Sequence, residues 1–72
     1  MAYMNSTFSK RLRELREEKK INRHALSKEL EFGGNVIEQL EKERYIPRLD
    51  VVIKLAQFFG VSVGYMAGEE ER

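Results

Sequence analysis

The sequence predicts an all-α domain of five short helices, and three kinds of observation support this fold class. Apolar residues recur at three- and four-residue spacing along most of the chain, as they do on the buried stripe of an amphipathic helix. Asn22 and Ser62, residue types that commonly cap helix N-termini, stand just before two of these periodic segments. Gly60 and Gly68 stand just after the last two segments, in the position where helices commonly end.

The first expected helix spans residues 7–20 and follows a loose N-terminal arm, residues 1–6, in which no apolar period is found. Phe8, Leu12 and Leu15 stand at i, i+4 and i+7, which places them on one stripe of this helix. The charged residues of this helix are interpreted as a solvated face, which is the usual role of such runs.

Residues 22–42 carry the most informative pattern, two short helices joined by a tight turn. Asn22 is placed to cap a helix over residues 23–30, the connection covers residues 31–34, and the second helix ends near Lys42. Such a pair forms a helix-turn-helix, whose second helix can enter the major groove of DNA. Four residues give this second helix one continuous polar face: Asn35, Glu38, Gln39 and Lys42.

Glu41 does not belong to this polar face, because it lies four residues after Ile37 and so leans toward the core. A carboxylate in that position needs a charged partner to offset the loss of its hydration. Arg16 is the best candidate, since it lies four residues after Leu12 at the margin of the first apolar stripe. We therefore predict an Arg16–Glu41 ion pair that joins the first helix to the third.

Two further helices are expected after Pro47, which cannot continue a preceding helix. The first, residues 49–59, is apolar over much of its circumference, which indicates either a central place in the core or contact with another chain. The second, residues 63–67, offers more apolar surface than a small domain needs. Its residues either close the core of the protomer or form a dimer contact, for which the candidates are Val63, Tyr65 and Met66.

The composition narrows the class of protein. A length of 72 residues predicts one small domain, without a separate catalytic or ligand-sensing unit. The sequence has no cysteine and a single histidine, His24, so we expect no disulfide, metal site, cofactor or small-molecule ligand. No apolar run approaches membrane-spanning length and no signal peptide precedes the domain, so we expect a cytoplasmic protein without membrane contact.

The net charge of +1 is low for a protein that binds nucleic acid, but the distribution of charge reduces this objection. Residues 69–72 form an acidic C-terminal tail, which we expect to be solvated and frayed. Without this tail, residues 1–68 carry twelve Lys and Arg against nine Asp and Glu, a net charge of +3. The folded domain itself is expected over residues 7–68.

Five parts of the chain between Phe8 and Gly68 follow a known family pattern: RLRELREEKK, INRHALSKEL, VIEQLEKE, Pro47 and LDVVIKLAQFFGVSVGYMAG. With them the chain resembles the Cro/C1-type (XRE-like) helix-turn-helix family of lambdoid phage repressors and their bacterial relatives. The resemblance implies a compact five-helix, lambda-repressor-like DNA-binding domain with the helix-turn-helix in its second and third helices. Arg16 and Glu41 match the interhelix ion pair of this family.

The same resemblance implies roles for individual residues. Gln39 matches a base-reading glutamine of such repressors and Asn35 matches a second reading position, and either amide can pair with an adenine edge. Glu38 and Lys42 share this face, where Glu38 can accept from a cytosine amino group. The residues expected to contact phosphates or the DNA backbone are Asn22, Arg23, Lys28, Arg44, Tyr45 and Arg48.

Three departures from the family pattern bear on DNA reading. Arg23 stands where the family usually has a phosphate-contacting Gln, a change that adds charge. Glu31 stands where the turn usually holds a left-handed Gly, at a modest backbone cost. Gly33 and Gly34 stand at the start of the third helix, where related repressors carry base-reading side chains. Each of these glycines is expected to cost about 0.5–1 kcal/mol of helix stability.

Three functions of different classes follow from these patterns. The leading hypothesis is a sequence-specific DNA-binding transcriptional regulator, a repressor rather than an activator, that reads the major groove with its third helix as a homodimer. The alternative is a protein-interaction module with the same fold, antitoxin-like or anti-repressor, with weak or no DNA binding. An enzyme is the weakest hypothesis, because no nucleophile stands with a base and an orienting group.

Overall fold

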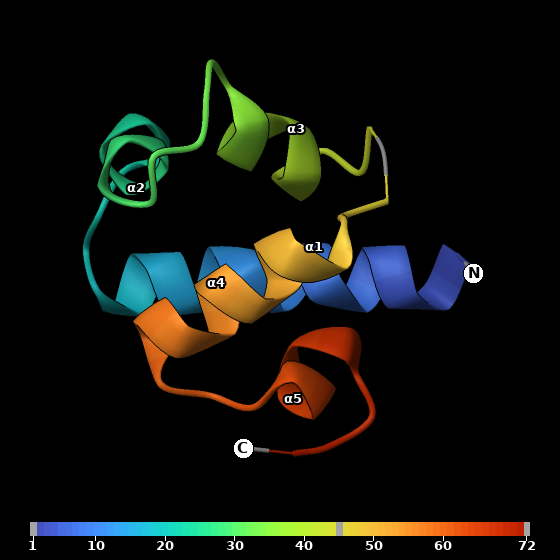
Figure 1. Ribbon diagram of the computed structural model, residues 1–72. Coiled ribbons are helices and arrows are strands. Elements are labelled where there is room, and N and C mark those ends of the chain that lie inside the picture. The colour runs from blue at the N-terminus through green and yellow to red at the C-terminus, as the bar shows by residue number, and fades with distance from the viewer. Residues whose placement is uncertain (1, 45, 72) are drawn as a thin grey trace.

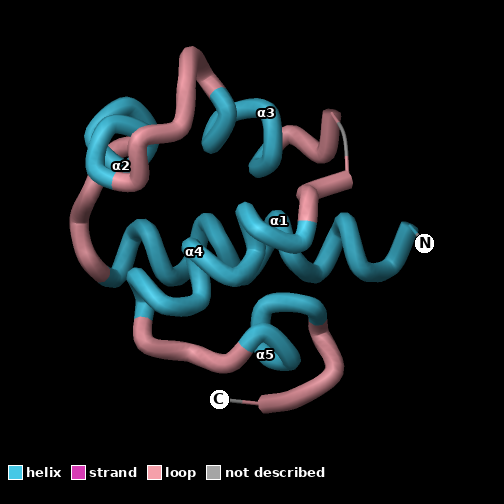
Figure 2. Tube along the Cα trace, viewed as in Figure 1, coloured by secondary structure: helices cyan, strands magenta, loops and turns pink. Residues whose placement is uncertain are grey.

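Figure 1 shows the computed structural model, which describes residues 2–44 and 46–71. The helices, in chain order, are α1 (Ala2–Glu18), α2 (Arg23–Glu29), α3 (Val36–Glu41), α4 (Leu49–Phe59) and α5 (Val63–Ala67). The tube in Figure 2 has helices and connections but no strand over the described residues. In both views α1 and α4 lie across the middle of the molecule, with α2 and α3 on one side and α5 on the other. The all-α fold class and the five helices predicted from the sequence are confirmed.

A single hydrophobic core connects the five helices. The stripe predicted on α1 is buried, because Phe8 and Leu12 have no exposed surface and Leu15 is almost completely covered. α1 contacts both α3 and α5, so it supports the helix-turn-helix pair from one side and the C-terminal helix from the other. The other helices contribute to this core Leu26, Ile37, Leu40, Val52, Leu55, Ala56, Tyr65 and Met66.

The first helix is longer than the sequence pattern predicts. α1 begins at Ala2 and not near Thr7, so the expectation of a loose arm over residues 1–6 is wrong for residues 2–6. Met1 lies outside the described residues. Residues 2–6 contain neither Pro nor Gly, so nothing in them stops a helix that the buried stripe from Phe8 onward stabilises. The missing apolar period therefore does not mark the start of the helix.

The turn between α2 and α3 contains two residues with a left-handed backbone. Glu31 has φ of +61° and Gly34 has φ of +56°. Glu31 therefore bears the backbone cost expected of a non-glycine residue in that conformation. α3 begins at Val36, so Gly33 and Gly34 lie in the turn and not in the helix. The expectation that they weaken the third helix is wrong, and Gly34 supplies a conformation that the turn requires.

α4 and α5 have the bounds and the caps that the sequence predicts. Gly60 ends α4 in a left-handed conformation, with φ of +71°. The Ser62 hydroxyl caps α5 by accepting a hydrogen bond from the backbone N–H of Tyr65 at 2.9 Å. Gly68 ends α5, again in the left-handed region. These short-range signals therefore determine the ends of both helices.

Replacing Gly60 with alanine is expected to lower the free energy of unfolding by about 1–2 kcal/mol. A Cβ at this position meets no atom within 4 Å, so the cost comes from the left-handed backbone alone. Urea unfolding measures the change. Gly33→Ala is the matched control, because Gly33 also has open space around a Cβ but its φ lies outside the left-handed region. Equal losses in the two variants would contradict this account.

The described part of the acidic tail, residues 69–71, is exposed and contacts the rest of the domain. Arg11 Nη1 donates a hydrogen bond to the carbonyl oxygen of Glu70 at 2.8 Å, and Arg11 also pairs with Glu71 at 3.7 Å. The Ser62 hydroxyl donates to Oε1 of Glu70 at 2.6 Å. The side chain of Glu70 lies over Gly64, where a Cβ would approach its Cδ to 2.6 Å. Residues 69–71 are thus solvent-exposed, as expected, and also have partners on α1 and at the start of α5 that the sequence pattern does not predict.

Candidate nucleic-acid interface

The outer side of α3 carries the polar face predicted from the sequence. Ile37, Leu40 and Glu41 point inward and are buried. Asn35 and Lys42 are exposed, and Glu38 and Gln39 are half-buried. The structure therefore places all four predicted base-reading residues on the side of α3 that faces away from the core, where another molecule can reach them.

Glu38 and Lys42 form an ion pair along this face. Lys42 Nζ donates to Oε2 of Glu38 at 2.8 Å, across one turn of α3. This hydrogen bond, and then the positive charge of Lys42, lower the pKa of the Glu38 carboxyl below its usual value. Glu38 is therefore ionised at neutral pH and can only accept hydrogen bonds, while Lys42 beside it can only donate.

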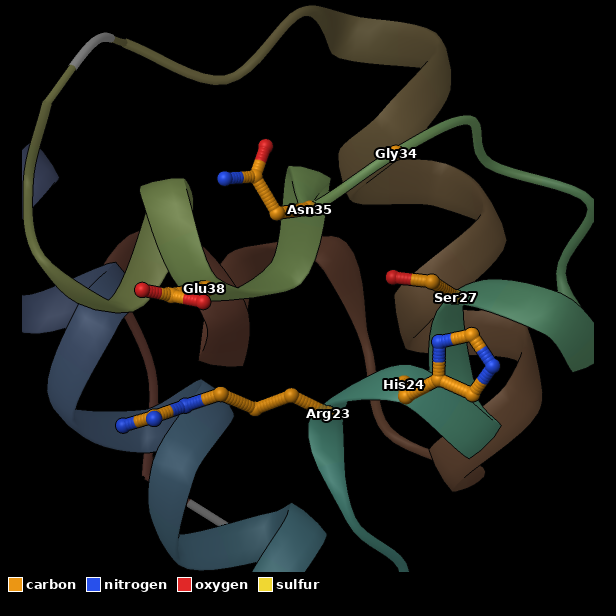
Figure 3. A pocket seen from close by; sticks show the side chains of 6 residues that line it. All are labelled: Arg23, His24, Ser27, Gly34, Asn35 and Glu38. Atoms are coloured by element: carbon orange, nitrogen blue, oxygen red, sulfur yellow. The ribbon is translucent and has the colours of Figure 1, made fainter.

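A small groove separates α2 from α3 next to this face. Figure 3 shows three of its side chains coming from α2, two residues from the turn and one from α3. The groove has a volume of about 130 Å³, whereas pockets for small-molecule ligands start at about 300 Å³. It therefore suits a single chemical group better than a whole metabolite. Its lining consists of Arg23, His24, Ser27, Gly34, Asn35 and Glu38.

The Arg16–Glu41 ion pair predicted from the spacing is present. Arg16 Nε lies 2.6 Å from Oε2 of Glu41, and Arg16 Nη2 lies 3.2 Å from Oε1. The side chain of Glu41 is completely buried and that of Arg16 is 13% exposed. The fork of one arginine thus engages both carboxylate oxygens and connects α1 to α3.

Two further arginines approach the same carboxylate, and the sequence analysis missed both. Arg23 Nε donates to Oε1 of Glu41 at 3.0 Å, and Arg13 Nε lies 3.7 Å from that oxygen. Arg13 precedes Arg16 by three residues on α1, a spacing that indicates a shared flank of the helix. No comparable signal connects Arg23 on α2 with Glu41 on α3. We call these four residues the Glu41 cluster: Arg13, Arg16, Arg23 and Glu41.

The residues expected to contact phosphates differ in their exposure and in the partners that their side chains already have. Asn22 caps α2, its Oδ1 accepting from the backbone N–H of Ala25 at 2.7 Å, as predicted. Arg48 is 83% exposed and lies 3.4 Å from the exposed carboxylate of Asp50. Lys28 and Arg44 are exposed, and Arg23 belongs to the Glu41 cluster. The prediction for Tyr45 falls outside the described residues.

Two of the three predicted dimer residues are buried within the protomer, which favours the alternative that they close its core. Tyr65 is 7% exposed and Met66 has no exposed surface, so both side chains close the core of the protomer. Val63 is 38% exposed and still offers a surface. Among the side chains that the structure describes, the other large apolar ones that are exposed lie on or just before α4, and they are Ile46, Leu49 and Ile53.

The described residues contain no cluster of His, Cys, Asp or Glu side chains with the arrangement of a metal site. None of their helices has the length and apolar character to span a membrane.

The chain is similar in sequence to known proteins. A family model described as "Helix-turn-helix domain" matches residues 9–68. The cryptic phage CTXphi transcriptional repressor RstR of Vibrio cholerae is 33% identical over 64 residues, which cover 89% of this chain and 58% of RstR. The HTH-type transcriptional regulator ImmR of Bacillus subtilis (strain 168) is 28% identical over 65 residues, covering 90% of this chain and 51% of ImmR. The chain thus spans little more than half the length of these curated relatives. No solved structure matches it.

Proposed function

We propose, since the chain belongs to the helix-turn-helix domain family, that it binds double-stranded DNA and regulates transcription, as a repressor rather than an activator. The observation that carries this proposal is the outward polar face of α3, a helix that follows α2 after a tight turn and packs against it. The second helix of a helix-turn-helix can enter the major groove of DNA. The names of the two relatives, a transcriptional repressor and a transcriptional regulator, support it.

Base reading is assigned to α3 in the major groove. Gln39 and Asn35 each offer an amide that can pair with two atoms of an adenine edge. Glu38 accepts and Lys42 donates, so the ion pair between them suits a C·G pair. The positive charges that flank this face and that would engage phosphates are Arg23, Lys28, Arg44 and Arg48.

Homodimer formation is the second part of the proposal. Val63 on α5, and Leu49 and Ile53 one turn apart on α4, expose apolar surface that a second copy of the chain would cover. In a two-fold dimer each protomer would present its α3 to one half-site. The half-sites would lie about 34–36 Å apart, one turn of the DNA helix.

The direct test is binding of a random-sequence duplex at several salt concentrations. Each phosphate contacted by a Lys or Arg should add about −0.9 to the slope of log K against log salt. Steeply salt-dependent binding supports the proposal, and a lack of binding even at low salt overturns it. Selection of bound duplexes from a random pool then reports the half-site sequence and spacing together.

Gln39→Ala and Arg48→Ala should affect DNA binding in different ways. Loss of the Gln39 amide should weaken the free energy of binding to the preferred site by about 1–3 kcal/mol. It should also reduce the base preference at one position of that site. Arg48→Ala should weaken all sequences alike and reduce the salt slope by about 1. Fluorescence anisotropy on matched and mismatched duplexes distinguishes the two patterns. An unchanged base preference in Gln39→Ala would refute the reading role.

A protein-interaction module remains the second candidate, and one observation favours it. Gly33 and Gly34 bring no side chain to the edge of the face where related repressors read bases, and Lys42 is paired with an acid on that face. A chain that forms stable complexes with another protein but binds no duplex at low salt would support this candidate.

A further inference from the structure

Arg23 and Glu41 connect the buried ion pair of the domain to its DNA-facing surface. We propose that Glu41 is a positioning residue for DNA binding, because its buried carboxylate holds Arg23 by Nε and directs the rest of the guanidinium toward a backbone phosphate. This inference rests on the proposed DNA-binding function and adds to it a device that prepares a phosphate contact before DNA arrives.

The ion pair of Glu41 is already complete without Arg23. Arg16 engages both carboxylate oxygens, at 2.6 and 3.2 Å, from a nearly buried position. Arg23 adds a third hydrogen bond, at 3.0 Å to Oε1, although its own side chain is 42% exposed. Burial of the Glu41 carboxylate is already offset by Arg16 and does not require the half-exposed Arg23. The main consequence of the additional hydrogen bond is therefore that it fixes the position of the Arg23 side chain.

The hydrogen bond to Glu41 leaves the two terminal amino groups of Arg23 available for a phosphate. The hydrogen bond to Glu41 uses Nε–H, whereas the two terminal amino groups of a guanidinium are the ones that commonly grip a phosphate from two sides. A shallow groove beside them is lined by Arg16, Asn22, Arg23, His24 and Glu38. Glu38 also lines this groove, and its negative charge is paired with Lys42 through a hydrogen bond of 2.8 Å. A phosphate oxygen can therefore approach Arg23 from the solvent side.

Charge and entropy both favour an anion at this place. Glu41 contributes one negative charge, and Arg13, Arg16 and Arg23 approach it within 3.7 Å, so positive charge is in excess at the junction of α1, α2 and α3. A free arginine loses side-chain freedom when it binds a phosphate. Arg23 has lost part of this freedom already, because Glu41 fixes the position of its guanidinium.

The test uses the full chain and a short random-sequence duplex over a range of salt concentrations. Arg23→Lys keeps the positive charge, but a single ammonium group cannot bind Glu41 and at the same time donate two parallel hydrogen bonds to a phosphate. It should weaken binding about tenfold, which corresponds to one charged hydrogen bond, and leave the salt slope unchanged. Arg48→Lys is the matched comparison, because it measures the same exchange at an exposed arginine that no buried carboxylate holds. The loss at Arg23 should be the larger one.

A double-substitution cycle distinguishes positioning by Glu41 from a general advantage of arginine. With Glu41→Gln already present, the further change Arg23→Lys should weaken binding by about twofold or less, because the holding charge is gone. An undiminished tenfold effect in that background would overturn the positioning role. Failure of the wild-type chain to bind any duplex at low salt would instead overturn the proposed function itself.

Arginine-selective NMR keeps the test decisive if Glu41→Gln does not fold. In the free wild-type chain the Nε–H proton of Arg23 should exchange with water more slowly than that of Arg48. On addition of the duplex this proton should stay protected, while the terminal amino groups of Arg23 shift. Equal exchange rates for Arg23 and Arg48 would overturn the inference.

Discussion

Replacing Glu41 with alanine is expected to lower the free energy of unfolding by about 3–5 kcal/mol. The variant strands Arg16, which is 13% exposed and loses the partner of two hydrogen bonds. It also removes one of the polar connections between α1 and α3. Because a domain of this length has a total stability of about 4–11 kcal/mol, the variant should lie close to the limit of folding. Urea unfolding followed by circular dichroism measures the loss.

Two comparisons show whether an unpaired charge causes this loss. The double change Arg16→Met with Glu41→Leu should restore much of the stability, because it removes the stranded charge together with its partner. Glu38→Ala breaks an ion pair at the surface and should leave the unfolding midpoint nearly unchanged. An unchanged midpoint for Glu41→Ala itself would show that the buried pair does not stabilise the fold.

Replacing Met66 with alanine is expected to lower the free energy of unfolding by about 2–5 kcal/mol. Met66 has no exposed surface and packs in the core shared by the five helices, so truncation leaves a cavity. The expected loss follows from the burial of Met66, for which the sequence left open either a core role or a dimer contact. A residue at a subunit contact would affect association, whereas a core residue affects folding at any protein concentration. Thermal unfolding at several protein concentrations shows whether the loss of stability is independent of concentration.

Val63→Ala is the matched control for Met66→Ala. Val63 is on the same helix but is 38% exposed, so its truncation should change the stability of the protomer little. Sedimentation analysis should show weaker self-association in this variant if Val63 forms part of the proposed dimer contact. A Met66→Ala variant with normal stability and lost association would restore the original prediction for that residue.

Local patterns in the sequence were sufficient to predict most of the helices and their ends. Asn22, Ser62 and Gly60 determine helix ends through contacts within a few residues, so their roles follow from the sequence alone. The Arg16–Glu41 pair was predictable because two independent helical periods point at each other. The Cro/C1-type family predicted from these segments is confirmed by the match over residues 9–68.

The features that the sequence did not predict depend on contacts between distant segments. Arg23 reaches Glu41 across the gap between α2 and α3, and Arg11 reaches Glu70 across most of the chain. The spacing of Arg23 and Arg11 within their own helices does not indicate these partners. Gly34 was misplaced for a related reason, since only the path of the turn shows that α3 begins after it.

The turn before α3 also bears on how such a protein can acquire a new target. A Cβ at Gly33 meets no atom within 4 Å, and the φ of Gly33 lies outside the left-handed region, so this position can accept a larger residue. Gly34 lacks this freedom because its φ is +56°. One substitution at Gly33 can therefore place a new side chain beside Asn35 without disturbing the scaffold. A substitution at Gly33, natural or engineered, can therefore change which surface the start of α3 recognises while the fold stays the same.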